Sequence, residues 1–385
     1  MSSKLQQVAK HQKKWFGKFH TWGGITAGFV IIIVSLTGAL LVFESELDVW
    51  LHPQAFKFDE NGERLSFDQV KVSLDQNHPE YQINGIFILD DKNDAYASFA
   101  KNGNNEQLII NPYTAEITAA RVYRETPMGF IRHLHRTLLI PPFGKYLVGV
   151  SSLICVFMMI TGLRLWFPNK INFLKNRLTL KFSKSGKKLN YDLHNRLGVY
   201  FSPVITLISI TGVMITFNQI ILFFLFLLSF ESPVSVAEIL NQRSVYIENS
   251  KPIGMNQAAS LAQNIFPEGE VRGVSLPSDK YGVYQVHLLL PAISKEKNSA
   301  ILFIDQYSGE IINSSEDKKF KLLKVYTNWV TPIHYGTFGG LPTRIVALMA
   351  TIITAILFVS GFLIWWSRRK KMFHRKSEIG EAKSV

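Results

Sequence analysis

Four histidines are the residues of this chain whose types and spacing indicate chemistry. His20 and His194 stand at the start of apolar stretches, and His135 and His334 stand shortly before two others. Imidazole is a common metal ligand and an axial ligand of haem iron, and polar groups at membrane depth are costly and often functional. The four histidines therefore predict metal or haem ligation at the edges of a membrane.

The segments that carry these histidines are repeated. Residues 19–43 align without a gap with residues 193–217, and residues 134–167 align with residues 333–366. A weaker repeat relates residues 108–118 to residues 302–312. Repeats of this kind predict two homologous halves, each with two spanning helices and two histidines. The aligned pairs include His20 with His194, Gly38 with Gly212, His135 with His334, Lys145 with Arg344, Gly162 with Gly361, and Trp166 with Trp365.

Composition places the chain among membrane proteins. It is 47% hydrophobic over 385 residues, its mean hydropathy is positive, and the apolar residues are concentrated in four runs. Such runs of about 20 residues are long enough to cross a bilayer. The single cysteine, Cys155, excludes disulfides and covalent CxxCH haem attachment, so any haem is expected to bind non-covalently.

The net charge of +13 could indicate nucleic-acid binding, but its distribution indicates membrane orientation instead. Lysine and arginine crowd the N-terminus, the loop after the second apolar run, and the tail. These three regions are expected in the cytoplasm, with both termini on the inner side of the membrane and the two long loops outside. The cations that carry this prediction include Lys4, Lys10, Lys13, Lys14, Lys18, Lys170, Lys175, Arg177, Lys181, Lys184, Lys187, Lys188, Arg368, Arg369, Lys370, Lys371, Arg375 and Lys376.

The expected fold is an α-helical bundle of four transmembrane helices in two homologous halves, with two small α+β extracytoplasmic domains. Each outer domain is expected to hold one helix, at 67–76 or 255–266, and a small antiparallel sheet. The predicted segments are a cytoplasmic arm (1–18), spanning helices (19–43, 145–167, 195–218, 344–366), outer domains (44–130, 231–333), a basic cytoplasmic loop (168–194), an interfacial segment or extension of the third helix (219–230), and a cytoplasmic tail (367–385).

This topology places two histidines at each membrane face. His20 and His194, the inner pair, fall at the cytoplasmic ends of outward-running helices, and His135 and His334, the outer pair, fall at the outer ends of inward-running helices. Two imidazoles at one depth can bind a planar metal macrocycle from both sides, and two such pairs would give an electron path across the membrane. Zinc is the competing metal, but it prefers four ligands, and the sequence offers no cysteine or clustered carboxylate to complete them.

Glycines and cations could complete these sites. Gly38 lies 18 residues beyond His20, about 27 Å along a helix, so it should reach the outer site, and Gly162, Gly212 and Gly361 have the same relation to the site remote from their own end. Such glycines would let a porphyrin approach closely, whereas the other small residues of these helices, Gly23 and Gly28 among them, are expected to serve helix packing. The cations near the histidines could bind haem propionates or could only set topology: Lys18, Arg132, Arg136, Lys145, Arg196 and Arg344. His133 has no aligned counterpart and is expected to point away from His135.

These residues resemble the PepSY-associated transmembrane proteins. The resemblance rests on Lys18-Phe19-His20 before a helix ending in Thr37-Gly38, on Leu134-His135-Arg136, on Tyr191-Asp192-Leu193-His194, and on Ile333-His334 before a helix ending in Trp365-Trp366. It implies two b-type haems bound non-covalently, with His20 and His194 holding one and His135 and His334 the other. It also implies a bacterial inner-membrane protein of a family that is often iron-regulated and that includes members which reduce ferric siderophores at the periplasmic face.

The leading hypothesis is a di-haem reductase that passes electrons to a ferric siderophore or another ferric chelate at the outer face. Its electrons would come from a separate donor, either a cytoplasmic reductase or quinol, because the sequence has no GxGxxG or Walker motif. No acid–base catalytic residue is required for this chemistry. Two alternatives stay open: a membrane-anchored PepSY binding or regulatory protein without redox activity, and a transporter.

Overall fold

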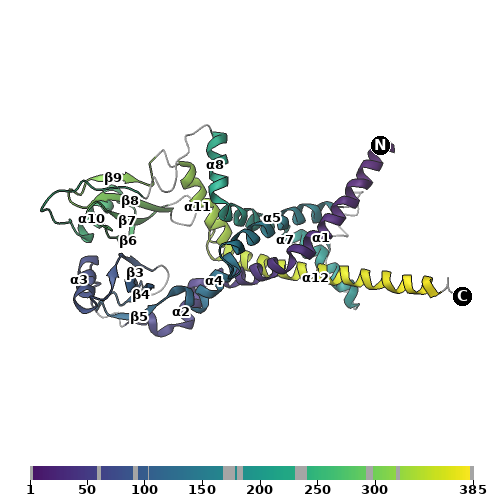
Figure 1. Cartoon of the computed structure of the whole chain (residues 1–385), viewed down its shortest axis with the longest axis horizontal. Helices are drawn as coiled ribbons and strands as arrows, with labels where there is room; N and C mark the ends of the chain where they lie inside the picture. Colours follow the sequence, from purple (N-terminus) through teal and green to yellow (C-terminus); the bar gives the residue numbers. More distant parts are fainter. Residues whose placement is uncertain are drawn as a thin grey trace.

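The structure, a computed structural model, describes residues 3–58, 62–89, 94–102, 104–167, 178–179, 185–229, 241–291, 298–317 and 321–381. It consists of a bundle of long helices and a separate antiparallel sheet domain at one end of that bundle (Figure 1). The N-terminal end of the first helix and the C-terminal end of the last lie at the end of the bundle remote from the sheet (Figure 1).

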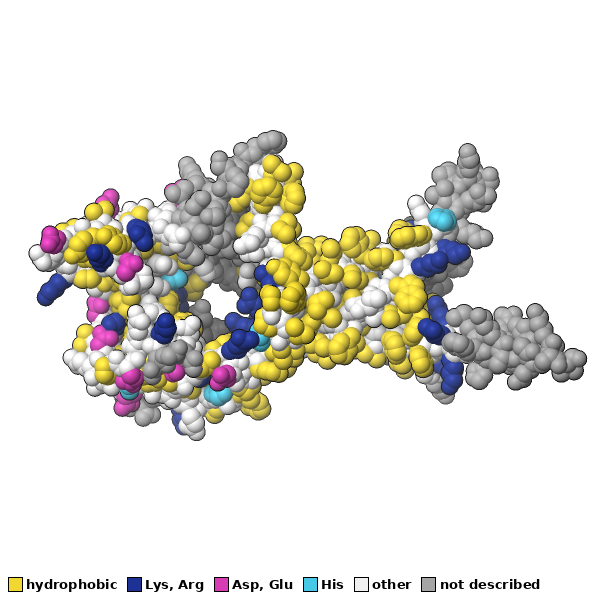
Figure 2. All heavy atoms as spheres, in the orientation of Figure 1, with side chains coloured by type: hydrophobic (Ala, Val, Ile, Leu, Met, Phe, Trp, Pro, Cys, Tyr) yellow, Lys and Arg dark blue, Asp and Glu magenta, His cyan; other side chains and the backbone are white. Residues whose placement is uncertain are grey.

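Four helices of the bundle are long and apolar enough to cross a membrane. Both α5 and α12 pack against α1 and α7, so the two pairs alternate around the bundle. Hydrophobic side chains cover the outside of the bundle as well as its interior (Figure 2), as expected for a surface that faces lipid. The helices are α1 (Ser3–Leu41), α5 (Phe143–Trp166), α7 (Gly186–Thr216) and α12 (Leu341–Glu381).

Three of these helices extend beyond the apolar runs. Helix α1 begins 16 residues before the predicted 19–43 span, α7 begins nine residues before the predicted 195–218 span, and α12 continues 15 residues past the predicted 344–366 span. The prediction followed hydropathy, whereas the flanking segments are rich in lysine and arginine, which are good helix formers, and they contain no proline. Several cations used for orientation lie outside the described residues: Lys170, Lys175, Arg177, Lys181 and Lys184.

The third spanning helix ends at a break. The sequence left open whether residues 219–230 extend this helix or form a separate interfacial segment, and the structure has a separate segment. Helix α7 ends at Thr216, and α8 (Asn218–Ser229) follows as a separate helix that runs across the bundle direction (Figure 1). Leu222 and Phe226 of α8 pack against Tyr326 and Val330. Large side chains on the other faces of α8 are exposed, as an interfacial helix requires.

The two outer loops share a single antiparallel sheet instead of forming two separate ones. The strand order is β5-β4-β3-β2-β6-β7-β8-β9, with β1 paired to β3. The loops join where β2 pairs with β6, with Ile86 opposite Val274. Glycines make this joint possible, because a Cβ on Gly85 would lie 2.8 Å from the Val274 carbonyl oxygen and one on Gly273 would lie 2.4 Å from the Phe87 ring. The strands are β1 (Gln82–Ile83), β2 (Gly85–Ile88), β3 (Tyr96–Asn102), β4 (Asn104–Ile110), β5 (Ile117–Arg121), β6 (Glu270–Ser275), β7 (Val283–Leu290), β8 (Asn298–Asp305) and β9 (Ile311–Ser314).

Helices α3 (Phe67–Asn77) and α10 (Met255–Ile265) share one core with this sheet. They meet at their first turns, where the Asp68 carboxylate accepts the backbone N–H groups of Met255 (2.8 Å) and Asn256 (3.0 Å). Residue 254 before α10 is a glycine and has no side chain to cap the helix, so Asp68 of the other loop supplies the cap. The two loops therefore form one domain through both the sheet and the helices.

Among the described residues, five short helices were not predicted from the sequence, and two of them carry the outer histidines. His135 lies in α4, which ends where Leu138 adopts a left-handed conformation, and His334 lies in α11, which ends before Gly336 at φ 75°. The sequence placed both histidines at the ends of spanning helices, whereas α5 and α12 begin only after these turns. The five are α2 (Glu44–Leu51), η1 (Pro53–Ala55), η2 (Tyr123–Glu125), α4 (Pro127–Thr137) and α11 (Lys321–Tyr335).

Candidate functional site

The inner pair lies inside the bundle. His20 on α1 and His194 on α7 face each other with ring centroids 6.2 Å apart. Nδ1 of His20 lies 3.1 Å from the carbonyl oxygen of Met158 on α5, and Nδ1 of His194 lies 3.0 Å from that of Leu357 on α12. A hydroxyl group supplements each bond, from Thr161 at 3.3 Å and from Ser360 at 2.9 Å.

The outer pair repeats this arrangement with different helices. The ring centroids of His135 on α4 and His334 on α11 are 6.3 Å apart. Nδ1 of His135 lies 3.0 Å from the Val34 carbonyl oxygen and 3.1 Å from Thr37 Oγ1, both on α1. The structure thus brings together the histidines that the sequence paired. On α7, the Ile208 carbonyl oxygen and Thr211 Oγ1 each lie 3.1 Å from Nδ1 of His334.

Each ring rests in a notch with the same sequence pattern. A carbonyl oxygen at position i, a Ser or Thr at i+3 and a glycine at i+4 line the notch, as in Met158, Thr161 and Gly162. A Cβ on that glycine would lie only 3.0 Å from Cε1 of His20, so the glycine makes room for the ring. The corresponding distance is 3.0 Å from Gly361 to His194, and 3.1 Å both from Gly38 to His135 and from Gly212 to His334.

The notch therefore gives the four glycines a contact that the sequence did not predict. They were expected to face a porphyrin, and what lies against them in the structure is a histidine ring from the neighbouring element. The hydroxyl residues Thr161 and Ser360 were also missed. Their signal was available as a Ser/Thr-Gly doublet near one end of every spanning helix: Thr37-Gly38, Thr161-Gly162, Thr211-Gly212 and Ser360-Gly361.

The carbonyl partners fix the tautomer of all four histidines. A carbonyl oxygen only accepts hydrogen bonds, so Nδ1 must carry the proton and Nε2 of the neutral ring keeps a free lone pair. Within the described part of the chain, no hydrogen bond involves Nε2 of these four residues. At the outer site, burial and then the neighbouring His334 lower the pKa of His135 to about 4, and burial lowers the pKa of His334.

The ring spacing matches ligation of one metal from two sides. An imidazole nitrogen binds a first-row metal at about 2.0–2.1 Å and the ring centre lies roughly 1.1 Å behind it, so two opposed rings have centres roughly 6.3 Å apart. The observed separations are 6.2 and 6.3 Å. Metal-ligating histidines also commonly donate their other N–H to a carbonyl oxygen, as these four do. The residues present therefore fit two metals, each with two axial imidazoles.

A cavity of about 780 Å³ surrounds the inner pair and is lined by all four spanning helices. This volume is within the range of small-molecule and cofactor sites. Its walls include aromatic and glycine residues from positions that align in the sequence repeat, and Arg368 and Arg369 line it as well. The sequence assigned those two arginines only to topology. The aligned wall residues are Gly24 with Gly198, Gly162 with Gly361, and Trp166 with Trp365.

The structure gives the other predicted cations different surroundings. Arg344 makes a two-pronged ion pair with Glu46 at 2.7 Å and donates to the Val42 carbonyl oxygen, so it ties α12 to α1 and α2. Lys145 is exposed in the first turn of α5, Lys18 is exposed on α1, and Arg196 is buried.

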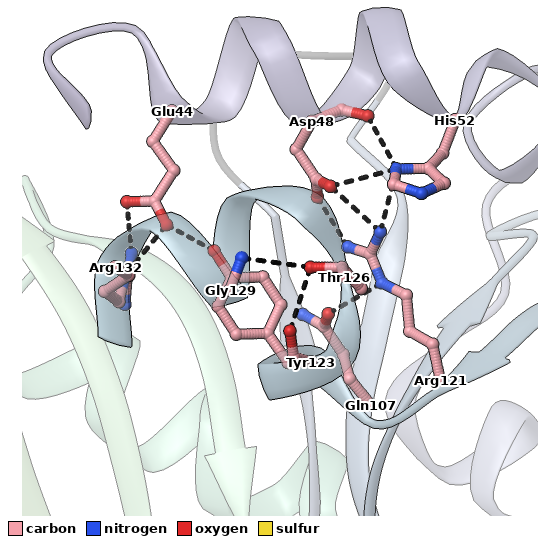
Figure 3. A network of polar contacts seen from close by, with 9 residues as sticks. All are labelled: Glu44, Asp48, His52, Gln107, Arg121, Tyr123, Thr126, Gly129 and Arg132. Carbon is pink, nitrogen blue, oxygen red and sulfur yellow. Dashed lines mark hydrogen bonds and ion pairs between the residues drawn. The ribbon is translucent and has the colours of Figure 1, made fainter. Parts of the chain in front are cut away.

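A network of polar contacts holds α4 in place (Figure 3). Glu44 of α2 accepts hydrogen bonds from Tyr123 and from Arg132, which lies one turn before His135. Asp48 binds Arg121 of β5, and the Arg121 Nε donates to Gln107 at 3.1 Å. A Cβ on Gly129 would lie 1.7 Å from the Tyr123 carbonyl oxygen, so α4 packs directly on the η2 backbone. The helix of one outer histidine is therefore fixed to both α2 and the sheet.

The chain matches the family model of the PepSY-associated TM region over residues 18–368. No curated protein sequence matches it. Because the family match covers the four spanning helices and the sheet domain, the chain belongs to the PepSY-associated TM family and is a membrane protein.

Proposed function

We propose that this PepSY-associated TM protein is a di-haem electron-transfer protein of a bacterial inner membrane, built from two homologous halves. His20 and His194 would hold the inner haem b, and His135 and His334 the outer haem b, both non-covalently. The observation that carries the proposal is the repeated notch, which prepares four Nε2 lone pairs in two pairs at the spacing of bis-imidazole ligation.

The donor set favours haem over zinc. Among the described residues, no group of three or more His, Cys, Asp and Glu side chains converges on a common point. Two axial imidazoles suffice when a macrocycle supplies the remaining ligands, whereas a structural zinc site usually needs four protein ligands. The cavity around His20 and His194 also has room for a macrocycle between the four helices.

The protein residues would orient the groups and exclude water. Each carbonyl and hydroxyl pair fixes one imidazole ring in one tautomer, and the apolar bundle core between the sites keeps solvent out. Bound haem would supply one-electron transfer between the two faces. The basic residues at the end of the bundle remote from the sheet would face the cytoplasm, so both termini would be inside and the outer pair would lie near the periplasm.

The proposed acceptor is a ferric siderophore or another ferric chelate at the outer face. One electron, supplied by a separate cytoplasmic reductase or by quinol, would convert bound Fe(III) to Fe(II). Hard oxygen ligands hold Fe(II) less tightly than Fe(III), so the reduction would release the iron. The sheet domain lies at the end of the bundle where α4 and α11 carry the outer pair, and there it could contact the chelate (Figure 1).

Visible spectroscopy of the purified protein tests this proposal. We expect about two haems per chain, with sharp bands on dithionite reduction that disappear when a ferric chelate is added. His135→Ala combined with His334→Ala should remove about half of the haem and abolish reoxidation by the chelate, because the outer ligands are lost.

His78→Ala is the matched control, because His78 is a surface residue that contacts Glu80. It should retain both haems. A colourless wild-type protein produced with haem available would overturn the proposal and favour the anchored binding module.

A further inference from the structure

Two arginines beside the outer pair lie on one face of the α4 region. Arg124 of η2 donates a hydrogen bond to Nε2 of His133 on α4. Thr137 donates its hydroxyl proton to the His133 carbonyl oxygen at 2.9 Å, so it accepts from His133 Nδ1 at 3.1 Å. The His133 ring is therefore held between Arg124 and Thr137, and it fixes the Arg124 guanidinium group in place.

Arg136 lies three residues after His133 on α4, so the two side chains lie on the same face of the helix. Both arginines are exposed. The three side chains thus form a compact group, which we name the α4 cation cluster: Arg124, His133 and Arg136.

The charge of this cluster is not neutralised within the described part of the chain. Arg121 and Arg132, its neighbours, are paired with Asp48 and Glu44. No such ion pair with a described carboxylate joins Arg124 or Arg136. Arg121 and Arg132 thus bind carboxylates of α2, whereas the guanidinium groups of Arg124 and Arg136 keep N–H donors available for a ligand.

The cluster occurs on one side of the outer pair only. In the sequence alignment of the two segments, His133 falls on Pro332 and Arg136 falls on Tyr335 of α11. If these cations served only to orient the chain in the membrane or to keep it soluble, there would be no reason for them to occur in one half of the chain and not in the other. Figure 2 shows an opening between the sheet domain and the bundle, with Lys and Arg side chains on its bundle side. An incoming ligand could reach α4 through this opening.

We infer that the α4 cation cluster recognises the substrate, and that the substrate is a ferric chelate with net negative charge on catecholate or carboxylate oxygens. This inference rests on the proposed reductase function and narrows its substrate class. Planar guanidinium groups bind oxyanions with two parallel hydrogen bonds. Unpaired cations also attract an anionic ligand from solution and increase its association rate.

Binding of gallium chelates tests the inference without electron transfer, because Ga(III) resembles Fe(III) in charge and is not reduced. The probes are an anionic gallium tris-catecholate and a neutral gallium trihydroxamate, titrated against the full-length protein in nanodiscs. Arg124→Gln combined with Arg136→Gln should weaken binding of the anionic chelate about tenfold or more and leave the neutral chelate unchanged. Added salt should weaken anionic binding in the wild type more than in the double variant.

Arg243→Gln is the matched control, because Arg243 is an exposed arginine of the second loop that lies over the Tyr281 ring. It should bind both probes like the wild type. Equal affinity of the double variant and the wild type for the anionic probe, or equal weakening for both probes, overturns the inference. If the anionic gallium probe binds as expected but its iron counterpart does not reoxidise the reduced protein, the proposed function fails while the anion site stands.

Discussion

The inner and outer histidine pairs have the same notch geometry but different mechanical support. The inner histidines belong to spanning helices α1 and α7 and rest in notches of α5 and α12, so they move only with the bundle. The outer histidines belong to short helices α4 and α11 and rest in notches of α1 and α7. The outer site is therefore the one that the sheet domain can influence, because α4 is bound to it through a polar network (Figure 3).

A bulky residue in the notch tests this difference most strongly. Gly162→Val places branched carbon atoms against His20, whose ring is carried by a spanning helix that cannot shift independently of the bundle. We expect loss of the inner haem from the reduced spectrum. Gly38→Val should lower the affinity of the outer site for haem by about 10–100-fold but not abolish binding, because α4 can shift.

Haem-to-protein ratios and haem titrations of the apoprotein measure both effects. Gly186→Val is the control, since a Cβ at Gly186 would meet no atom within 4 Å. Equal losses at the two sites would show that α4 is held as firmly as a spanning helix. Normal haem content in both variants would show that the glycines are not needed to seat the histidine rings, and that the two sites do not differ in this respect.

The supports of α4 and α11 provide a second comparison. Glu44→Ala leaves Arg132 and Tyr123 without their common acceptor, and we expect about tenfold weaker haem binding at the outer site. Tyr326→Phe removes one hydrogen bond to the Met214 carbonyl oxygen, while the packing of α11 on α8 remains. We therefore expect Tyr326→Phe to weaken haem binding at the outer site by only about fivefold, which corresponds to the loss of one hydrogen bond of about 1 kcal/mol.

Salt distinguishes the two supports. Raised ionic strength should weaken the outer site of the wild type and of Tyr326→Phe, since both keep the charged network, and should have little further effect on Glu44→Ala. Glu80→Gln, a change at a surface carboxylate that contacts His78, is the control. If Tyr326→Phe weakens the outer site more than Glu44→Ala does, the hydrogen bond from Tyr326 to the Met214 carbonyl oxygen is the more important support.

The sequence predicted much of this organisation because its patterns are periodic. Residue spacing along a helix placed Gly38 at the opposite end from His20, and the repeats assigned the other glycines. One helix and a small antiparallel sheet were predicted in each loop from strand and turn signals, and the structure has α3, α10 and the strands in these loops. The backbone carbonyl partners of the histidines could not be predicted, because every residue has a carbonyl oxygen and the sequence therefore does not mark the one that binds.

Other features depend on contacts between distant segments. The separate helices α4 and α11 were missed because they are short and only partly apolar, and their ends depend on left-handed residues such as Leu138. The joined sheet depends on close backbone approach at Gly85 and Gly273, which a single sequence does not distinguish from ordinary strand glycines. Arg368 and Arg369 were predicted as topology signals, and the cavity that they line forms only when four helices come together.

A third prediction concerns the joint between the two loops, which does not involve the bundle. Asp68→Ala removes the cap from α10 and should destabilise the sheet domain by about 1–2 kcal/mol. Thermal unfolding followed by tryptophan fluorescence and circular dichroism measures this change, and both haem spectra should stay unchanged. Asp75→Ala, on the same helix but paired only with Lys71 at the surface, should cost less. A haem spectrum that changes with Asp68→Ala would show that the joint also positions the outer pair.

The smallest expected effect compares two turns that align in the repeat. Asp305 accepts the backbone N–H groups of Tyr307 (2.8 Å), Ser308 (2.9 Å) and Val245 (2.9 Å), whereas Asn111 accepts only that of Tyr113 (2.9 Å) among the described hydrogen bonds. Burial alone would raise the pKa of Asp305, but the backbone N–H donors outweigh burial and lower it. The ionised Asp305 therefore stabilises the turn above the ordinary aspartate pKa, and this contribution is lost as pH falls through the lowered value.

Asp305→Asn should consequently destabilise the sheet domain by roughly 0.5–1 kcal/mol at neutral pH, and the difference from wild type should shrink below about pH 4. Asn111→Asp should change stability less, because the first turn offers a charge fewer donors. Denaturant unfolding of the full chain at a series of pH values measures both. If the difference in unfolding free energy between Asp305→Asn and the wild type stays constant into acid, the shape of the side chain, and not its charge, decides the stability of this turn. The two aligned turns would then be equivalent in spite of their different residues.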